Sequence, residues 1–309
     1  MRVARFLTSE PILAIAAFLV AGSPVAGQGS RTDSLFRTIQ WTSGPGTTRI
    51  GPFVEFAIPA DCRFTDKSGA RSFMEATENP SGDEDGVLLC PGTSESDAPW
   101  FVTFRYDPSG YVKDDESKSL DAAKILETLR RGNAEGNKER LSRGWDTLHL
   151  VGWVRPPYYD AVTHNLTWSA EASGTHGLVV NHSVRLLGRG GVLHAELIIE
   201  PAQLSTAIPR FDEAIGGASF VKGQGYSEWR PGDKVAAYGL TALVAGAAAV
   251  KLGLFGKLWQ LIAALFITIW KLLVVAVLGV AGWVRSLFSG KKRRSKEQAG
   301  GSAPGTGPS

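Results

Sequence analysis

Two long apolar stretches near the C-terminus indicate that this chain is attached to a membrane. Residues 258–284 form a 27-residue stretch broken only by Gln260, Thr268 and Lys271, and residues 235–250 carry no charge. A helix of this length covers the roughly 30 Å hydrocarbon core of a bilayer, whereas soluble helices are rarely apolar all round. The sequence therefore predicts a transmembrane helix at 235–255 and a second one at 258–284.

The N-terminus has the pattern of a secretory signal peptide. Arg2 and Arg5 precede an apolar run at 11–21, and small residues follow at 25–27. The run is about half as long as a bilayer crossing requires. Residues 1–27 are therefore predicted to be a signal peptide, either cleaved before Gln28 or retained as an anchor. Both alternatives place the following domain, residues 28–233, on the exported side.

The number of membrane crossings stays open at this point. Two crossings leave the basic cluster at 291–294 on the exported side, whereas the positive-inside tendency favours the cytoplasm and an odd number of crossings. Lys271 either reaches an interface through helix tilt or marks a functional position inside the membrane. Residues 285–309 are predicted to form a basic and then disordered tail.

Charge is unevenly divided along the chain. Residues 28–233 carry 21 basic and 28 acidic side chains, and residues 234–309 carry 10 basic and 1 acidic. Phosphate binding needs clustered Lys and Arg, so the exported domain is not expected to bind nucleic acid. The partners we expect are the lipid bilayer and a protein in or at the membrane.

Period-two alternation predicts antiparallel strands at 100–106, 148–154 and 166–170. A hairpin is the most specific local prediction: 178–187 and 192–199 flank a glycine-rich turn whose residues tolerate positive φ. If Leu187 faces Val192, apolar pairs fall on one face, while Arg185–His194 and Ser183–Glu196 fall on the other.

Helical spacing of apolar residues appears at 120–129, followed by a charged run at 133–143, and again at 201–215. Antiparallel strands with a few packed helices make an α+β sandwich the predicted fold class, followed by the C-terminal transmembrane helices.

Cys62 and Cys90 are the only cysteines of the chain. In an exported, oxidising setting they are predicted to form a structural disulfide, the alternative being two buried free thiols.

Motifs that would name a reaction are absent from the sequence. There is no GxSxG elbow, no P-loop and no HExxH zinc motif, and no cofactor or metal site is expected. All five histidines lie between 149 and 194. His149, Asp160 and His164, with Arg155 nearby, remain the alternative site for an enzyme of unrecognised type.

Aromatic loops suggest a binding surface. Tyr111, Trp153, Tyr158 and Tyr159, together with Arg155, are of the residue types that anchor recognition surfaces. The alternative is that these side chains only cap the edge of the sheet.

Five segments carry a resemblance to a known family. They are GYVKDDE at 110–116, NKER at 137–140, VGWVRPPYYDAVTHNLTW at 151–168, RLLGRGGVL at 185–193 and RPGDKVAAYGLTALVAG at 230–246. Over about residues 51–256 the chain resembles the bacterial membrane-anchored proteins grouped as domain of unknown function 2167. The resemblance implies a periplasmic domain tethered to the inner membrane, without assigned catalytic residues. The order of elements is also similar to the α+β sandwiches of the PsbP type, an analogy that leaves function open.

Three hypotheses follow for the function. The first is a non-enzymatic binding or scaffold module held at the membrane, using the aromatic surface. The second is an enzyme using the region of His149, Asp160 and His164. The third is an accessory subunit of a membrane transport assembly in which Lys271 takes part.

Overall fold

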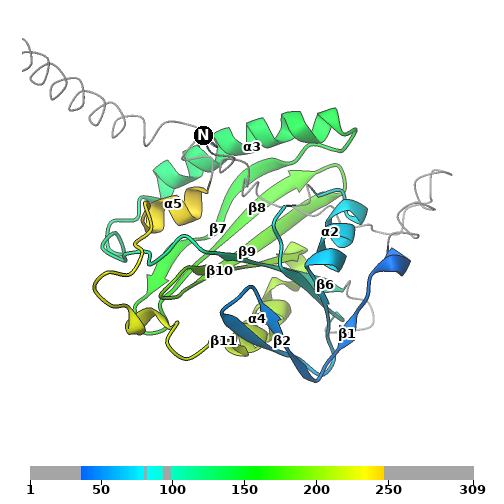
Figure 1. Ribbon diagram of the computed structural model, residues 1–309. Helices are drawn as coiled ribbons and strands as arrows, with labels where there is room; N and C mark the ends of the chain where they lie inside the picture. The colour runs from blue at the N-terminus through cyan, green and yellow to red at the C-terminus, as the bar shows by residue number, and fades with distance from the viewer. Residues whose placement is uncertain (1–35, 80–81, 93–98, 247–309) are drawn as a thin grey trace, which may run out of the picture. The chain divides into compact units, whose positions relative to one another are not determined.

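Alternating apolar residues build most of the domain as one large antiparallel sheet. The computed structural model describes residues 36–79, 82–92 and 99–246 (Figure 1). The predicted signal peptide, the apolar stretch at 258–284 with Lys271, and the tail at 285–309 lie outside these residues.

Eight strands form the main sheet, and every neighbouring pair is antiparallel. Their order is β1 (Thr42–Ser43), β4 (Arg63–Asp66), β5 (Gly86–Cys90), β6 (Trp100–Asp107), β10 (Val192–Ile199), β9 (Gly177–Leu187), β8 (Asn165–Gly174) and β7 (His149–Asp160). A smaller sheet has the order β11 (Ala218–Phe220), β3 (Val54–Ile58) and β2 (Gly46–Ile50). The α+β class with a large antiparallel sheet is therefore confirmed.

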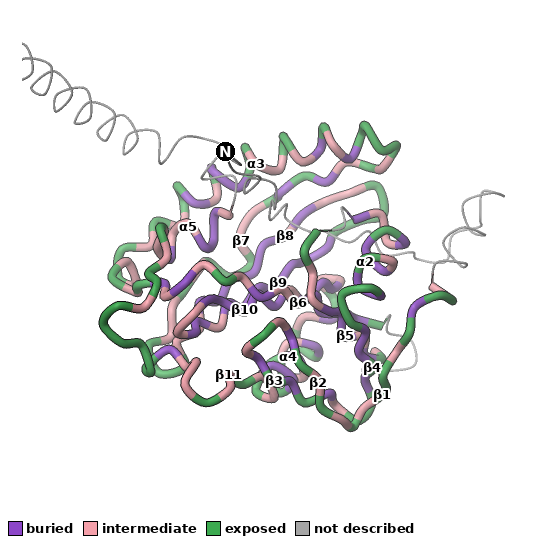
Figure 2. The backbone as a smooth tube through the Cα atoms, viewed as in Figure 1, coloured by how far each residue is buried: buried purple, intermediate pink, exposed green. Residues whose placement is uncertain are grey.

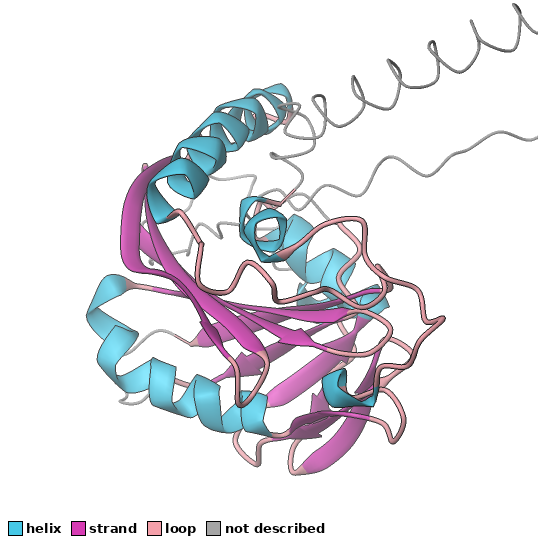
Figure 3. Cartoon of the chain, turned by 90° about the vertical axis from the view of Figure 1, so that its left-hand side faces the viewer, coloured by secondary structure: helices cyan, strands magenta, loops and turns pink. Residues whose placement is uncertain are grey.

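The principal helices are α2 (Lys67–Ala76), α3 (Ala122–Ser142), α4 (Leu204–Gly216) and α5 (Leu240–Ala245), with short 3₁₀ helices η1 (Pro201–Gln203) and η2 (Tyr226–Glu228). Figure 3 shows helices on both sides of the main sheet. The sequence predicted α3 and α4 but not α2. The start of α2 is fixed by Asp66, whose carboxylate accepts the backbone N–H groups of Ser68 and Gly69.

The β9–β10 hairpin has the predicted register. Leu187 pairs with Val192, and the following pairs keep in step along both strands. The sequence suggested that glycine occurs in this turn because it tolerates a positive φ, but Gly191 does not have a positive φ. A Cβ at Gly191 would lie 2.1 Å from the carbonyl oxygen of Asp107, so the turn needs glycine for space.

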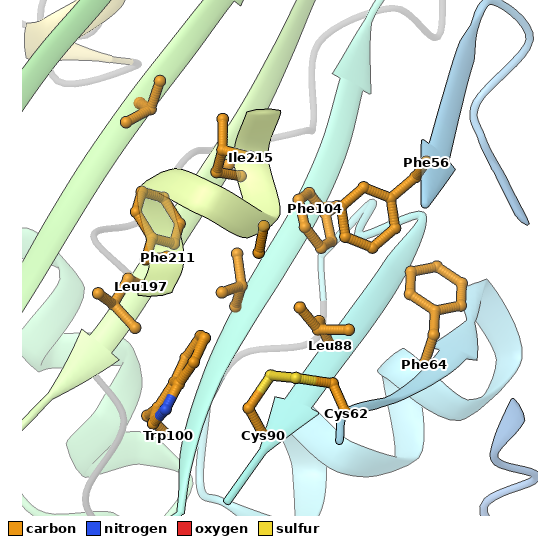
Figure 4. Close-up of a cluster of buried hydrophobic side chains, with 14 of the residues drawn as sticks. Phe56, Cys62, Phe64, Leu88, Cys90, Trp100, Phe104, Leu197, Phe211 and Ile215 are labelled. Atoms are coloured by element: carbon orange, nitrogen blue, oxygen red, sulfur yellow. A yellow bond between two sulfur atoms is a disulfide. The ribbon is translucent and has the colours of Figure 1, made fainter. Parts of the chain in front are cut away.

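One face of the main sheet packs against α4 and the small sheet (Figure 4). Phe211 of α4, Phe104 of β6 and Phe56 of β3 are fully buried, and the ring centroids of Phe56 and Phe104 are 5.0 Å apart. Cys62 and Cys90 form a disulfide within this core, between the start of β4 and the end of β5. These are the two cysteines whose pairing the sequence predicted.

The opposite face of the sheet carries two separate apolar clusters. One contains Leu166 and Trp168 of β8 under α3 and α5, and the other contains Phe101 of β6 under Phe73 of α2. The strands between them stay largely buried, as Figure 2 shows, although several of their side chains are polar. The sequence placed these polar side chains on one face but gave no sign that the face is covered.

Strand β7 is a protected edge. Its pairing with β8 is shifted by irregularities at three points, so Val154, expected to share a buried face with Leu148 and Leu150, is 48% exposed. Pro156 and Pro157 lie inside β7, where an edge position tolerates prolines.

Side chains of α3 complete the protection of this edge. Asn137 bonds both the backbone N–H and the carbonyl of Leu148, and Asn133 accepts the N–H of Leu150. Arg130 donates to the carbonyl oxygen of Val151. These bonds satisfy backbone groups that an open edge offers to other chains.

The segment before residue 247 belongs to the folded domain. Leu240, Leu243, Val244 and Ala245 of α5 are buried in the cluster around Trp168. The predicted boundary at 233 and the predicted transmembrane start at 235 therefore disagree with the packing of α5. Among the residues that the structure describes, no helix is long and apolar enough to cross a bilayer.

Candidate functional site

Five rings gather beside the turn between β7 and β8, and we call them the aromatic cluster: Tyr111, Tyr159, His164, Tyr226 and Trp229. Tyr111 stacks on Tyr226 with centroids 4.5 Å apart, and Trp229 lies 5.4 Å from Tyr111. His164 lies on another side of Tyr226, at 4.4 Å. The cluster joins a loop after β6, the end of β7, the β7–β8 turn and η2.

A short chain of hydrogen bonds fixes the inner part of the cluster. The Tyr159 hydroxyl donates to Asp114 Oδ2 at 3.0 Å, because a carboxylate only accepts. The Tyr159 hydroxyl oxygen also lies 2.9 Å from His164 Nδ1, which must then donate to it. Burial, followed by the hydrogen bond to Asp114, raises the pKa of Tyr159. The phenol stays protonated near neutral pH and serves to hold the turn.

Tyr226 is the buried centre of the cluster. Its side chain is 7% exposed, and its hydroxyl donates to the carbonyl oxygen of Val112 at 2.9 Å. Burial is also the largest cause that raises the pKa of Tyr226. Trp229, by contrast, is 37% exposed and Val235 is 40% exposed. The cluster therefore has a fixed, buried base. Trp229 and the neighbouring Val235 form an apolar rim that faces solvent.

Backbone hydrogen bonds hold the two loops of the rim together. Tyr111 N donates to the Lys234 carbonyl at 2.8 Å, and Ala236 N donates to the Tyr111 carbonyl at 2.9 Å. Gly110 has φ +100°, and a Cβ there would lie 2.6 Å from the Lys234 oxygen. Only glycine fits this approach without strain. Glu116 extends the connection, since its Oε2 accepts the backbone N–H of Thr241 at 2.8 Å.

The five residues predicted as one binding surface are divided between two faces of the sheet. Tyr159 and Trp153 pair with Leu166 and Ala170, which lie in the cluster under α3 and α5. Trp153 is further held by its Nε1, which donates to the carbonyl of Ala122. Tyr111 also packs against that cluster.

Arg155 and Tyr158 lie on the other face. They pair with Ser169 and Thr167, and Ser169 bonds His182 beneath α4. Ordinary strand alternation separates Tyr158 from its neighbour Tyr159. Arg155 leaves the face of Trp153 because the pairing of β7 is shifted between these two residues.

The residues of the hypothetical enzyme site do not converge. His149 and Asp160 occupy opposite ends of β7. Asp160 accepts the N–H of Val162 and the hydroxyl of Thr163, as a turn-forming carboxylate does. Within the described part of the chain, no three His, Cys, Asp or Glu side chains gather as a metal ion would require.

Sequence reasoning missed Tyr226 and Trp229. The available signal was their place just before the RPGDK segment at 230–234, one of the segments that carried the family resemblance. The contact with Tyr111 joins residues more than a hundred positions apart, and periodicity gives no information on such pairs.

Comparison with solved structures gives weak similarities. Cyanobacterial PsbP (CyanoP) from Synechocystis sp. PCC 6803 is 16% identical with a TM-score of 0.33, over 59% of this chain and 92% of that chain. LpqN, described as involved in cell envelope biogenesis of Mycobacterium tuberculosis, is 14% identical with a TM-score of 0.28, over 59% and 91%. PA94 of Pseudomonas aeruginosa, a protein of unknown function, is 13% identical with a TM-score of 0.26, over 42% and 77%. TM-scores this low carry no argument about fold or function.

A search of the curated proteins found no match. The family comparison, in contrast, covers most of the sequence. The family described as "Protein of unknown function (DUF2167)" matches residues 42–281, and the chain belongs to this family.

Proposed function

We propose that this protein is a membrane-anchored, exported binding module without catalytic activity, which contacts a protein partner at the membrane through the rim of the aromatic cluster. The observation that carries the proposal is the support beneath Trp229. Its exposed ring lies against Tyr111, which in turn stacks on the buried Tyr226. Rigid aromatic side chains lose little entropy on binding, and Trp and Tyr are enriched among residues that dominate binding energy.

The position of the rim suits a partner near the membrane. Trp229 and Val235 precede α5, which lies in the domain core and is followed in the sequence by the apolar stretch at 258–284. Because residues 240–245 are packed in the domain, we propose that residues 258–284 make a single crossing of the bacterial inner membrane. This arrangement puts the basic cluster at 291–294 in the cytoplasm, as the positive-inside tendency favours.

Phenols with raised pKa values support binding over chemistry. Tyr159 and Tyr226 stay protonated, and their hydroxyl groups donate fixed hydrogen bonds to Asp114 and to the Val112 carbonyl. Such groups are poor general bases near neutral pH. They make the base of the cluster rigid, which lowers the entropic cost of binding at its rim.

Co-purification tests the proposal. Full-length tagged protein is extracted gently from native membranes, and accompanying proteins are identified by mass spectrometry for the wild type, Trp229→Ala and Tyr158→Ala. Tyr158 is a matched control, since it is 47% exposed but lies on the opposite face of the sheet. We expect one partner that Trp229→Ala loses and Tyr158→Ala retains. A partner that stays bound to Trp229→Ala would contradict the proposed surface.

A further inference from the structure

A second group of polar side chains crosses the middle of the main sheet, and we call it the central polar row: Arg105, His194, Arg185, Glu196 and Trp168. His194 of β10 pairs with Arg105 of β6 on one side and with Arg185 of β9 on the other. Glu196 and Trp168 lie one step further along the same face, joined through Ser183 of β9. The row runs from the apolar cluster under α3 and α5, to which Trp168 also belongs, toward the cluster under α2.

Hydrogen-bond donors outnumber acceptors in this row. Arg105 Nη2 lies 3.1 Å from His194 Nδ1 and 3.5 Å from Nε2. Arginine only donates hydrogen bonds. In either neutral tautomer of His194, one ring nitrogen can accept from Arg105, and the N–H of the other ring nitrogen has no acceptor in Arg105. A protonated imidazole would have two such N–H groups.

Two further donors are buried without an acceptor among the described residues. They are Arg185 Nε and Trp168 Nε1, whose residues are 5% and 1% exposed. The two lie together, since the Arg185 guanidinium carbon is 4.5 Å from the Trp168 ring centroid. A buried donor without an acceptor costs about 1–3 kcal/mol.

The one carboxylate of the row is already engaged. Glu196 accepts from Arg185 Nη2 with one oxygen and from the Ser183 hydroxyl with the other. The nearby Asp107 on β6 accepts the Tyr238 hydroxyl at 2.5 Å. Among the described residues Arg105 forms no ion pair with a carboxylate, and burial lowers the pKa of the His194 side chain that it contacts, so this contact brings no negative charge to Arg105.

Solvent reaches the row at its ends. Arg105 is only partly buried, and the Glu196 side chain is 20% exposed. A small anion can therefore enter from solution beside Arg105, and the more deeply buried donors of Arg185 and Trp168 lie further along the same face.

We propose that the central polar row binds the carboxylate or phosphate group of a small ligand. An oxyanion offers several lone pairs, which are the acceptors that Arg105, His194, Arg185 and Trp168 lack. It also compensates the charge of Arg105. This site is independent of the aromatic cluster and of the proposed protein partner.

Anion titration of the purified full-length protein in detergent tests the site. The probes are inorganic phosphate and acetate, each compared with chloride at equal ionic strength, and binding is followed by calorimetry and by the midpoint of thermal unfolding. We expect saturable binding of at least one probe. Binding of phosphate alone would indicate a site for a phosphate group, and binding of acetate alone would indicate a site for a carboxylate.

Three variants complete the test. Arg105→Gln keeps amide donors but removes the charge, and Trp168→Phe keeps an aromatic ring but removes the Nε1–H. Each is expected to raise the dissociation constant about tenfold or more, since a hydrogen bond to a charged group contributes a binding free energy of that size. Arg155→Gln, an exposed arginine on the other face, is expected to bind as the wild type does. Absence of saturable binding by both probes, or wild-type affinity in both Arg105→Gln and Trp168→Phe, would overturn the proposal.

Discussion

Arg189 and Asp233 form a two-point ion pair: Arg189 Nε and Nη2 each donate to a different oxygen of Asp233, both at 2.7 Å. Arg189 lies in the β9–β10 turn, and Asp233 lies between η2 and α5. The Arg189 Nη1 adds a bond to the Gly223 carbonyl. This pair fastens the segment that carries Trp229 to the central hairpin, so it positions the rim of the aromatic cluster.

Breaking this pair should loosen the rim without unfolding the domain. We expect Asp233→Asn to speed amide hydrogen exchange at residues 226–236 relative to the sheet, because one of the two bonds from Arg189 is lost and the other no longer has a charged acceptor. Lys138→Ala, which removes an exposed pair with Glu135 on α3, is the control and should leave exchange at 226–236 unchanged. The hydrogen bond from Arg189 lowers the pKa of Asp233 to about 2, so wild-type protection factors at the rim, which are corrected for the intrinsic pH dependence of amide exchange, should stay constant from pH 7 to about pH 4.

Acid should destabilise the protein through His182. This side chain is 1% exposed, its Nδ1 lies 2.8 Å from the Ser169 hydroxyl, and its ring meets Phe211 edge-on. Burial, with a smaller effect of Arg155, lowers its pKa to about 4. The unfolded chain therefore takes up a proton near pH 6.5 while the folded protein does not, and stability falls as pH drops below 6.5.

The loss from His182 should reach about 3 kcal/mol near pH 4, at 1.36 kcal/mol per pKa unit. The difference between the denaturant-unfolding profiles of the wild type and His182→Asn from pH 7 to pH 4 measures it, because His194, which is also buried with a lowered pKa, contributes to the slope of both. His149→Gln replaces an exposed histidine of β7 and should leave the profile as in the wild type. Equal pH dependence in the wild type and His182→Asn would contradict the assignment.

Two glycine substitutions should change stability in opposite directions. Alanine at Gly191 would place a methyl group 2.1 Å from the Asp107 carbonyl oxygen and 2.7 Å from the Tyr106 hydroxyl, so Gly191→Ala should cost about 2–3 kcal/mol. Gly216, the last residue of α4, has open space around it and no positive φ. Gly216→Ala should be neutral or stabilise by about 0.5–1 kcal/mol. Thermal unfolding of the two variants side by side checks both signs.

Membrane topology offers a separate prediction. If α5 belongs to the domain and residues 258–284 cross once, green fluorescent protein fused after Ser309 should fluoresce, and alkaline phosphatase at the same place should be inactive. A cysteine at Ala237, which is exposed in the structure, should react with a membrane-impermeant maleimide added from the periplasmic side. An active phosphatase fusion, with Ala237→Cys unreactive, would instead support two crossings.

Local patterns predicted the central hairpin well. The register from Leu187 and Val192 onward follows from one requirement, that apolar and polar side chains separate onto two faces. In the same register His182 and His194 fall on opposite faces. This reasoning failed to show that the polar face is covered, because α2 and the apolar clusters on either side come from distant parts of the chain.

The aromatic cluster was predicted only in part, for a related reason. Tyr111 and Tyr159 were recognised by residue type, but the separation of Arg155 from Trp153 depends on an irregularity in the pairing of β7. Periodicity assumes a regular strand, so it cannot assign faces there. The sequence did not show that α5 packs in the domain core. An apolar helix suits a protein core as well as a bilayer, so apolar composition alone does not distinguish the two.

Site-specific photocrosslinking in living cells tests the central claim most directly. A benzophenone side chain is introduced in the full-length protein at Trp229 in one strain and at Tyr158 in another, and adducts are analysed after irradiation. The account predicts a discrete adduct with one protein from position 229 and none from position 158. No adduct from position 229, or the same adduct from both faces of the sheet, would contradict a binding surface at the rim of the aromatic cluster.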